Sequence, residues 1–305
     1  MKIIKPNTIA DANFISSNVL ENDYAVWNSA TTYALNTFVI YVTGGYHNIY
    51  KSLQGTNLNR NPTVEIQGDP LLPPAWWLLI SATNRWKAVD GRVDTQTINQ
   101  DSIKLAYSMD GRVGGISFQN LDAVSIDIVA YNQTSYYKKT ISLTSYGKQP
   151  SFNEYLYGLK KYQKKVYVDD LPQTSNLNIE ISINKIGGIA KCGLMAFGAV
   201  SDFQIPSYGL TLEAVDYTTV LRNFDGTVNI TKRGFSNVMD VSMWVPKDEL
   251  AFVSQFLNGN NSTPMAYIGV NDYEITNIYG MHTTHRISID MPTYSVLNFK
   301  IEGLI

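Results

Sequence analysis

Aromatic side chains recur at short intervals between residues 27 and 86, separated by turn residues and short strand-like runs. Four of the five tryptophans of this 305-residue chain lie in the stretch: Trp27, Trp76, Trp77 and Trp86. A unit of about 60 residues has too little interior to bury so many large rings. We therefore predict that some of them are displayed on a binding face.

The order of these aromatics is distinctive. Trp27 is followed by Tyr33, a Val-Ile-Tyr strand ending at Tyr41, a Gly-Gly-Tyr turn at Tyr46, an Asn-Pro pair and finally a Trp-Trp pair. This order resembles that of the small chitin-binding modules appended to chitinases and cellulases, which also occur in tail proteins of bacteriophages. The resemblance covers residues 23–86. It implies a short twisted antiparallel sheet whose exposed aromatics stack on sugar rings.

The resemblance implies a set of carbohydrate-binding residues, namely Tyr33, Tyr46, Tyr50, Trp76, Trp77 and Trp27. Side chains of neighbouring residues on a strand point to opposite faces, so one of the Trp-Trp pair is expected in the core and the other at the surface. Trp27 and Tyr41 are also candidates for the core of the module. His47 follows the turn tyrosine and is either a rim residue or a hydrogen-bond partner for a sugar hydroxyl.

At this length we expect two or three domains. The expected parts are an N-terminal arm (1–22) that docks on a partner or on the body, the chitin-binding-like module (23–86), a β-sandwich domain (87–200) and a β-rich domain with one helix (201–305). The last part resembles the sheet-and-helix domains of phage tail and baseplate proteins.

The fold class is predicted to be mainly β. Alternating or β-branched runs such as residues 103–107, 124–129 and 177–183 are separated by turns, several of them Asp-Gly, which is typical of a β-sandwich or jelly roll. One segment, residues 246–258, has a helical pattern. It begins with Pro246 and two acidic residues and is followed by Gly259.

Composition narrows the possible partners. The formal net charge is -2 and the pI is about 5.9, so no global positive field attracts nucleic acid. The sequence contains neither a signal-peptide pattern nor an apolar run that could insert into a membrane. The single cysteine, Cys192, cannot form an internal disulfide and is interpreted as a small core residue.

Catalytic and metal-binding patterns are sparse, so no catalytic residue, metal site or cofactor is predicted. The sequence has no nucleophile elbow, no phosphate-binding loop and no cysteine cluster of the zinc type. His282 and His285 are expected in an exposed turn. Carboxylates that could converge as an acid pair are Glu65, Asp69, Asp122, Asp127, Asp169 and Asp170, although turn roles are the preferred interpretation.

These observations lead to one principal hypothesis. We predict a non-enzymatic structural protein of a phage virion, located in the tail, assembled in the host cytoplasm with other tail or baseplate proteins, and forming a trimer or hexamer. Its module is expected to bind host surface polysaccharide. The alternatives are a glycan-degrading enzyme, and an architectural tail subunit whose module forms a protein interface rich in Tyr and Trp.

Overall fold

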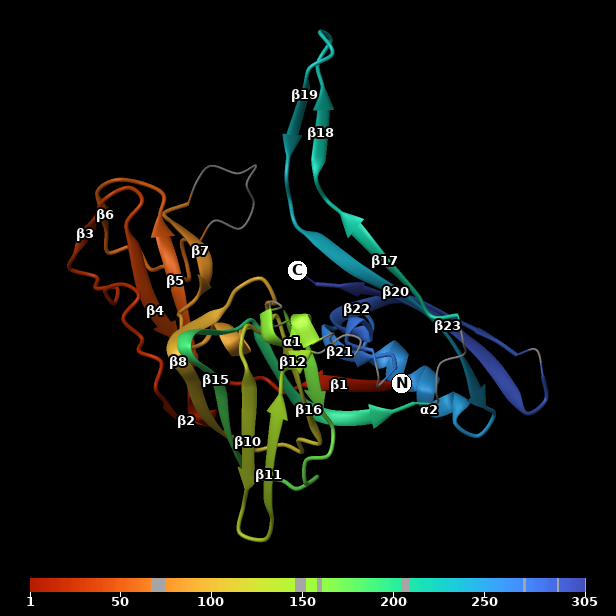
Figure 1. The fold of residues 1–305 in the computed structure, drawn as a ribbon. Helices are drawn as coiled ribbons and strands as arrows, with labels where there is room; N and C mark the ends of the chain where they lie inside the picture. The colour runs from red at the N-terminus through yellow and green to blue at the C-terminus, as the bar shows by residue number, and fades with distance from the viewer. Residues whose placement is uncertain are drawn as a thin grey trace.

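The computed structural model describes residues 1–66, 75–145, 152–157, 161–203, 209–270, 273–289 and 291–304. The chain is mainly β, as the sequence predicts, and its strands form two larger sheets, a small separate module and a projecting hairpin (Figure 1). Within the described residues, no helix is long and apolar enough to span a membrane.

The large sheet contains strands from both ends of the chain. Its order is β14-β9-β16-β1-β21-β22-β23-β20-β17, and every pairing is antiparallel. Its strands are β1 (Lys2–Pro6), β9 (Gly115–Gln119), β14 (Val166–Val168), β16 (Leu194–Asp202), β17 (Thr211–Asp216), β20 (Phe235–Pro246), β21 (Met265–Ile268), β22 (Asn277–Ser288) and β23 (Tyr294–Gly303).

The second sheet has the order β11-β10-β15-β8-β2 and lies below the module in Figure 1. Its strands are β2 (Phe14–Ser17), β8 (Thr97–Met109), β10 (Ser125–Tyr131), β11 (Tyr136–Ser142) and β15 (Leu177–Cys192). β8 and β15 are much longer than the alternating runs that predicted them. A bulge between Asn184 and Ile189 interrupts their register and lets the long pair continue.

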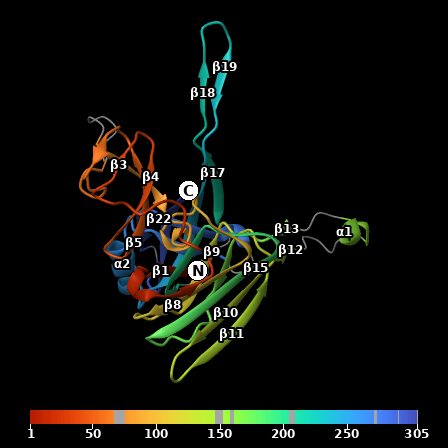
Figure 2. The ribbon, with the colours of Figure 1, turned by 90° about the vertical axis from the view of Figure 1, so that its left-hand side faces the viewer.

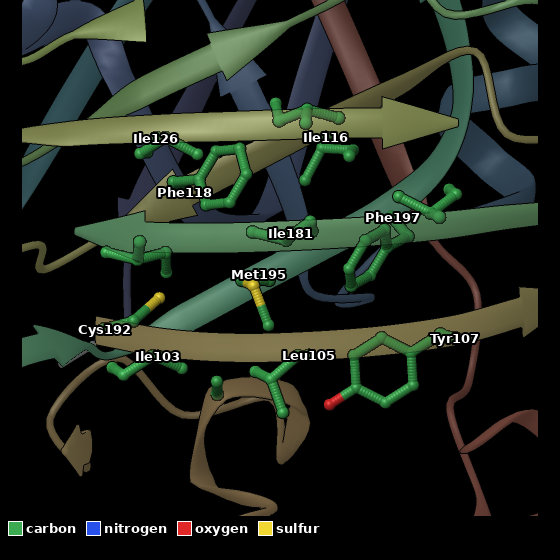
Figure 3. Close-up of a cluster of buried hydrophobic side chains, with 14 of the residues drawn as sticks. Ile103, Leu105, Tyr107, Ile116, Phe118, Ile126, Ile181, Cys192, Met195 and Phe197 are labelled. Carbon is green, nitrogen blue, oxygen red and sulfur yellow. The ribbon is translucent and has the colours of Figure 1, made fainter. Parts of the chain in front are cut away.

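The main core lies between these two sheets. Figure 3 shows Ile103, Leu105 and Tyr107 of β8 facing Met195 and Phe197 of β16, all of them almost completely buried. Alternate residues of β10 and β15 point into the same cluster. Two sheets packed face to face through alternating apolar side chains form a β-sandwich, which confirms the predicted architecture.

A second core lies under α2 (Leu250–Gly259), the longest helix among the residues that the structure describes. Val253 and Leu257 of α2 are buried against the large sheet, among residues such as Met243 and Phe299. The prediction of a helix near residues 246–258 is confirmed, but β20 extends through Pro246 and the helix begins at Leu250. A short helix that the sequence analysis did not predict is α1 (Phe152–Tyr157).

The predicted N-terminal arm belongs to the body. β1 lies between β16 and β21 in the large sheet, while β2 forms the edge of the second sheet beside β8. The expected boundary between residues 200 and 201 falls inside β16, so the large sheet joins the two predicted C-terminal parts. Residues 1–22 therefore contribute one strand to each of the two sheets and connect them covalently.

The module is a small twisted antiparallel sheet, as predicted. β4 (Phe38–Thr43), β5 (Tyr46–Ser52) and β7 (Trp77–Ala82) pair in that order, and β3 (Thr32–Tyr33) pairs with β6 (Asn57–Leu58) beside them. It ends at the short 3-10 helix η2 (Lys87–Val89). Further short elements are η1 (Asp11–Asn13), β12 (Thr144–Ser145), β13 (Lys161–Tyr162) and η3 (Glu274–Thr276).

A long hairpin projects away from the rest of the molecule. It consists of β18 (Thr219–Arg222) and β19 (Val228–Thr231), which continue β17 and β20 outward, and Figures 1 and 2 both show it standing clear of the sheets. Asp225-Gly226 forms its tip, as predicted for an Asp-Gly turn. Phe224 at the tip is fully exposed.

Candidate carbohydrate-binding site

Half of the predicted sugar-stacking residues form the core of the module. Tyr33, Tyr50 and Trp77 are buried together with Val39. The Tyr33 and Trp77 rings meet edge to face with centroids 5.5 Å apart, and the Trp77 indole donates a hydrogen bond to the Arg60 carbonyl at 2.9 Å. Because a buried ring cannot stack on a sugar, these residues are corrected from binding to structural roles.

Trp27 and Trp76 lie at the margin of this core. Both are half-buried, and Trp27 meets Tyr41 edge to face at 5.4 Å. The Arg60 guanidinium covers the Trp76 ring, 4.8 Å from its centroid. Of the Trp-Trp pair, Trp77 therefore lies inside the core, while Trp76, just before the start of β7, lies at its margin.

Tyr46 is the predicted binding residue that is exposed. It is the first residue of β5, and 49% of its surface is accessible. Gly44 and Gly45 before it have positive φ angles of 58° and 79°, a turn that glycine adopts without strain. A Cβ at Gly45 would lie 3.2 Å from the Asp11 backbone nitrogen, so this glycine lets the turn approach the N-terminal segment and fixes Tyr46 beside the body.

His47 anchors the module to the N-terminal segment. Its Nδ1 lies 2.7 Å from Glu21 Oε1 and its Nε2 2.8 Å from Asp11 Oδ1, while its ring stacks on Trp86. Arg85 Nη1 donates to the second carboxylate oxygen of Glu21. Both ring nitrogens are thus engaged, so His47 orients the module and is not free to bind a sugar hydroxyl.

A pocket of about 390 Å³ opens at this junction of module, N-terminal segment and body. Its polar lining residues come from four parts of the chain and include Asn7, Asn48, Asp90 and Tyr279 besides Tyr46. The buried indole N–H of Trp86, which also lines the pocket, has no hydrogen-bond acceptor among the described residues. An aromatic ring beside amide, hydroxyl and carboxyl groups is an arrangement suited to a polar ring-shaped ligand.

Asp90 gives the pocket an acid with unusual properties. Burial raises the pKa of Asp90 to about 6, against the opposing hydrogen bonds from the Arg92 backbone N–H and the Thr95 hydroxyl. Burial and the nearby charge of Asp90 raise the pKa of Tyr279 to about 12. Gly91 has a φ of 80°, which turns the chain so that Asp90 faces the pocket beside Tyr279.

The other candidate carboxylates are held by local partners instead of converging. Asp169 pairs with Lys2, Asp170 with Lys139, Asp122 with Lys185, Glu65 with Arg60, and Asp127 accepts from Thr140 and Asn184. Asp69 lies outside the described residues. The preference for structural roles therefore holds for those described.

The expectation of exposed turn histidines at 282 and 285 is wrong. His282 is completely buried in β22, where its Nδ1 lies 2.8 Å from the Tyr267 hydroxyl and its Nε2 3.0 Å from the Leu257 carbonyl of α2. A bulge between His282 and Thr284 adds one residue, so His282 and His285 share a face with rings 6.1 Å apart. Burial lowers the pKa of His282.

Cys192 is buried, as expected of a core residue, and burial raises the pKa of its thiol to about 12. Among the described residues, no group of three or more His, Cys, Asp or Glu side chains is arranged to hold a metal ion.

Sequence reasoning missed most of the pocket. In the sequence, Asp90 belongs to one of the Asp-Gly turns, and Trp86 is a member of the aromatic series. Tyr279 lies almost 200 residues further along the chain, and its place beside Asp90 depends on the large sheet. A local sequence pattern carries no signal for such a contact. No family model matches the chain, and no curated protein matches it.

Proposed function

We propose that this chain is a non-enzymatic structural subunit of a bacteriophage tail, which binds host surface glycans through the pocket beside Tyr46. The observation that carries the proposal is the position of Tyr46, an exposed ring from a module whose aromatic order resembles that of chitin-binding modules, in the lining of a pocket that combines polar and apolar side chains. Such a ring stacks on one face of a sugar while Asn7, Asn48 and Asp90 bind its hydroxyl groups.

One such contact is weak, because an aromatic ring contributes about 1 kcal/mol beyond its buried area. Useful attachment then depends on several copies acting together, which a trimeric or hexameric tail subunit supplies through effective concentration. The proposed partners are therefore further copies of this chain and other tail or baseplate proteins.

The projecting hairpin supports a role in an assembly. Opposite residues of an antiparallel pair share a face, so Val220 and Ile230 lie on one side of the hairpin together with Val228. All three are about half exposed. An isolated two-stranded hairpin is marginally stable in water, so a hairpin with an apolar face is best explained as a surface that another protein covers.

A binding role is favoured over hydrolysis by the pocket itself. Glycosidases generally use two carboxyl groups about 5–9.5 Å apart. Among the pocket-lining residues that the structure describes, Asp90 is the only carboxylate. The raised pKa of Asp90 is typical of a general acid, so glycan hydrolysis is the second candidate function. Hydrolysis predicts that the protein releases reducing ends from a glycan and that Asp90→Asn abolishes this release.

Glycan binding is tested by calorimetric titration of the purified protein with chito-oligosaccharides and with a panel of bacterial surface polysaccharides. The variant Tyr46→Ala should lose binding to whichever glycan the protein recognises. Tyr24→Ala is the matched control, because Tyr24 is also exposed, at 45%, but stacks on Phe38 with ring centroids 5.0 Å apart. Equal binding by both variants would refute the proposed site.

Location is tested separately on purified phage particles. Antibody labelling should place the chain on the tail. Replacing Val220, Val228 and Ile230 together by Ser should reduce its incorporation while leaving glycan binding by the free protein unchanged. Absence of the chain from particles that are otherwise complete would refute the structural role.

A further inference from the structure

The outer face of the large sheet carries a second group of side chains suited to ligand binding. Along β20, Val241 and Met243 point into the core under α2, while Asp240, Ser242 and Trp244 point outward. This alternation follows from the two-residue period of a strand. The outward residues belong to the face opposite α2, far along the chain from the module.

The strand register places polar residues of three strands side by side on this face. Ser242 lies opposite Asn298 of β23, which in turn lies opposite Arg286 of β22. In the next row, Lys300 lies between Asp240 and Thr284. The bulge in β22 shifts the alternation by one residue after the inward-facing His282, which is why Thr284 and Arg286 both face outward.

These two rows line a hollow of about 410 Å³, to which Gly209 also contributes. Arg286 and Lys300 form no ion pair and no side-chain hydrogen bond within the part of the chain that the structure describes, and neither does Asp240. The hollow therefore offers two uncommitted cations, one uncommitted carboxylate and neutral hydroxyl and amide groups.

An aromatic pair lies one row beyond the hollow on the same face. Trp244 follows Ser242 on the same face, and Tyr294 is its diagonal neighbour on β23. Their rings meet edge to face with centroids 6.4 Å apart, and 43% and 47% of their surfaces are exposed. Trp244 is the tryptophan outside the module, and the strand alternation places its large ring on the solvent-exposed face.

The chemistry of the face indicates its ligand. An exposed indole binds the apolar face of a sugar ring, and Ser, Asn, Thr and Asp side chains bind its hydroxyls. Arg286 and Lys300 favour a ligand that also carries an anionic group. They provide local positive charge even though the net charge of the whole chain is -2. A sugar ring with a carboxylate group satisfies all three features.

Single-stranded nucleic acid is the competing ligand, because it also binds basic and aromatic surfaces. It carries a phosphate on every nucleotide and is best bound by a continuous basic groove. Here Asp240 lies directly opposite Lys300, so the local excess of positive charge is small. A carboxylate opposite one of the two cations favours a ligand rich in hydroxyl groups over a polyphosphate.

We propose that the outer face of β20, β22 and β23 binds an acidic polysaccharide, with Arg286 and Lys300 holding a sugar carboxylate and Trp244 stacking on the adjacent ring. This goes beyond the proposed pocket beside Tyr46, which is a separate surface with its own test.

The test measures calorimetric binding of oligogalacturonate to the full chain at low and high salt. Wild type should bind, and binding should weaken as salt rises. Arg286→Gln with Lys300→Gln should weaken it about tenfold, and Trp244→Ala about fivefold. Trp244→Tyr keeps a ring and should retain most of the affinity. Far-UV circular dichroism checks that each variant is folded.

Matched controls come from the hairpin. Arg222→Gln with Lys232→Gln removes the same charge elsewhere, and Phe224→Ala removes another exposed ring. Both should bind as wild type does. The proposal is overturned if the charge control loses as much affinity as the Arg286 and Lys300 variant, or if wild type does not bind oligogalacturonate.

Two further outcomes separate this site from its competitors. Tighter binding of a single-stranded DNA oligonucleotide, with displacement of oligogalacturonate, would assign the face to nucleic acid and overturn the proposal. Loss of oligogalacturonate binding in Tyr46→Ala would place the ligand in the module pocket, which also overturns it but leaves the proposed function standing.

Discussion

Replacing Trp77 by Ala should unfold the module while leaving the two large sheets intact. Trp77 is fully buried among Tyr33, Val39 and Tyr50 and donates a hydrogen bond to the Arg60 carbonyl. Truncating a fully buried Trp to Ala costs about 3–5 kcal/mol, and the unpaired carbonyl adds about 1 kcal/mol.

That loss is comparable to the whole stability of the module. At about 0.05–0.15 kcal/mol per residue, a unit of about 60 residues is stable by about 3–9 kcal/mol. Trp76→Ala is the matched control, because Trp76 is half-buried and chiefly loses its contact with Arg60, worth about 1 kcal/mol. We therefore expect a folded module in the Trp76 variant and an unfolded one in the Trp77 variant.

Limited proteolysis followed by mass spectrometry measures the difference. Cleavage of the Trp77 variant should concentrate between residues 23 and 86, whereas β1 and β2 stay protected because they belong to the large sheets. Equal protection of the module in both tryptophan variants, at every protease concentration, would refute the assignment of Trp77 to its core.

Three further outcomes follow from the structure. Gly198→Ala should lower stability by about 2–3 kcal/mol, because its Cβ would collide with the backbone of Lys5 in β1, whereas Gly55→Ala meets open space and should be nearly neutral in the same thermal melts. The pKa of Asp90 is raised in the folded protein from 3.8 to about 6, so folding binds a proton and stability should fall as pH rises from about 4 to about 6. Asp90→Asn should reduce this loss in the free energy of unfolding by about 1–2 kcal/mol, after allowance for the partial exposure of Asp90. Urea unfolding at each pH measures the difference. The Cys192 thiol, whose pKa burial raises to about 12, should resist alkylation at pH 8 until the protein unfolds, and rapid labelling of native protein would contradict its place in the core.

Local patterns in the sequence were sufficient for many of the strands and for a small sheet in the aromatic stretch. Alternation along residues 177–183 marks a strand because one face packs on the core, and the aromatic series marks a small sheet whose rings need partners. It was also predictable that the side chains of Trp76 and Trp77, as neighbours in an extended segment, point to opposite sides. Which of the two points inward was not, because that depends on the bulge between Ile49 and Tyr50 in the pairing of β5 with β7.

Long-range pairing accounts for what local patterns missed. Residues Lys2–Pro6 carry only two aliphatic side chains, Ile3 and Ile4. Nothing in them indicates a strand inside a sheet, between neighbours that lie about 200 and more than 260 residues away. The burial of His282 has the same origin. Its partners are supplied by α2 and β21, and the bulge that redirects the strand has no signature in the sequence.

The junction between module and body determines how the proposed sugar pocket works. Carbohydrate-binding modules on flexible linkers sample many orientations. Here the module is fixed by the contacts of His47 with Asp11 and Glu21 and by the stacking of His47 on Trp86, and the body itself supplies Asp90 and Tyr279 to the pocket. A ligand in this pocket contacts both parts at once. In an assembly of identical subunits every pocket would point in the same direction relative to its body, so one extended glycan could engage several copies without the entropy cost of orienting each module.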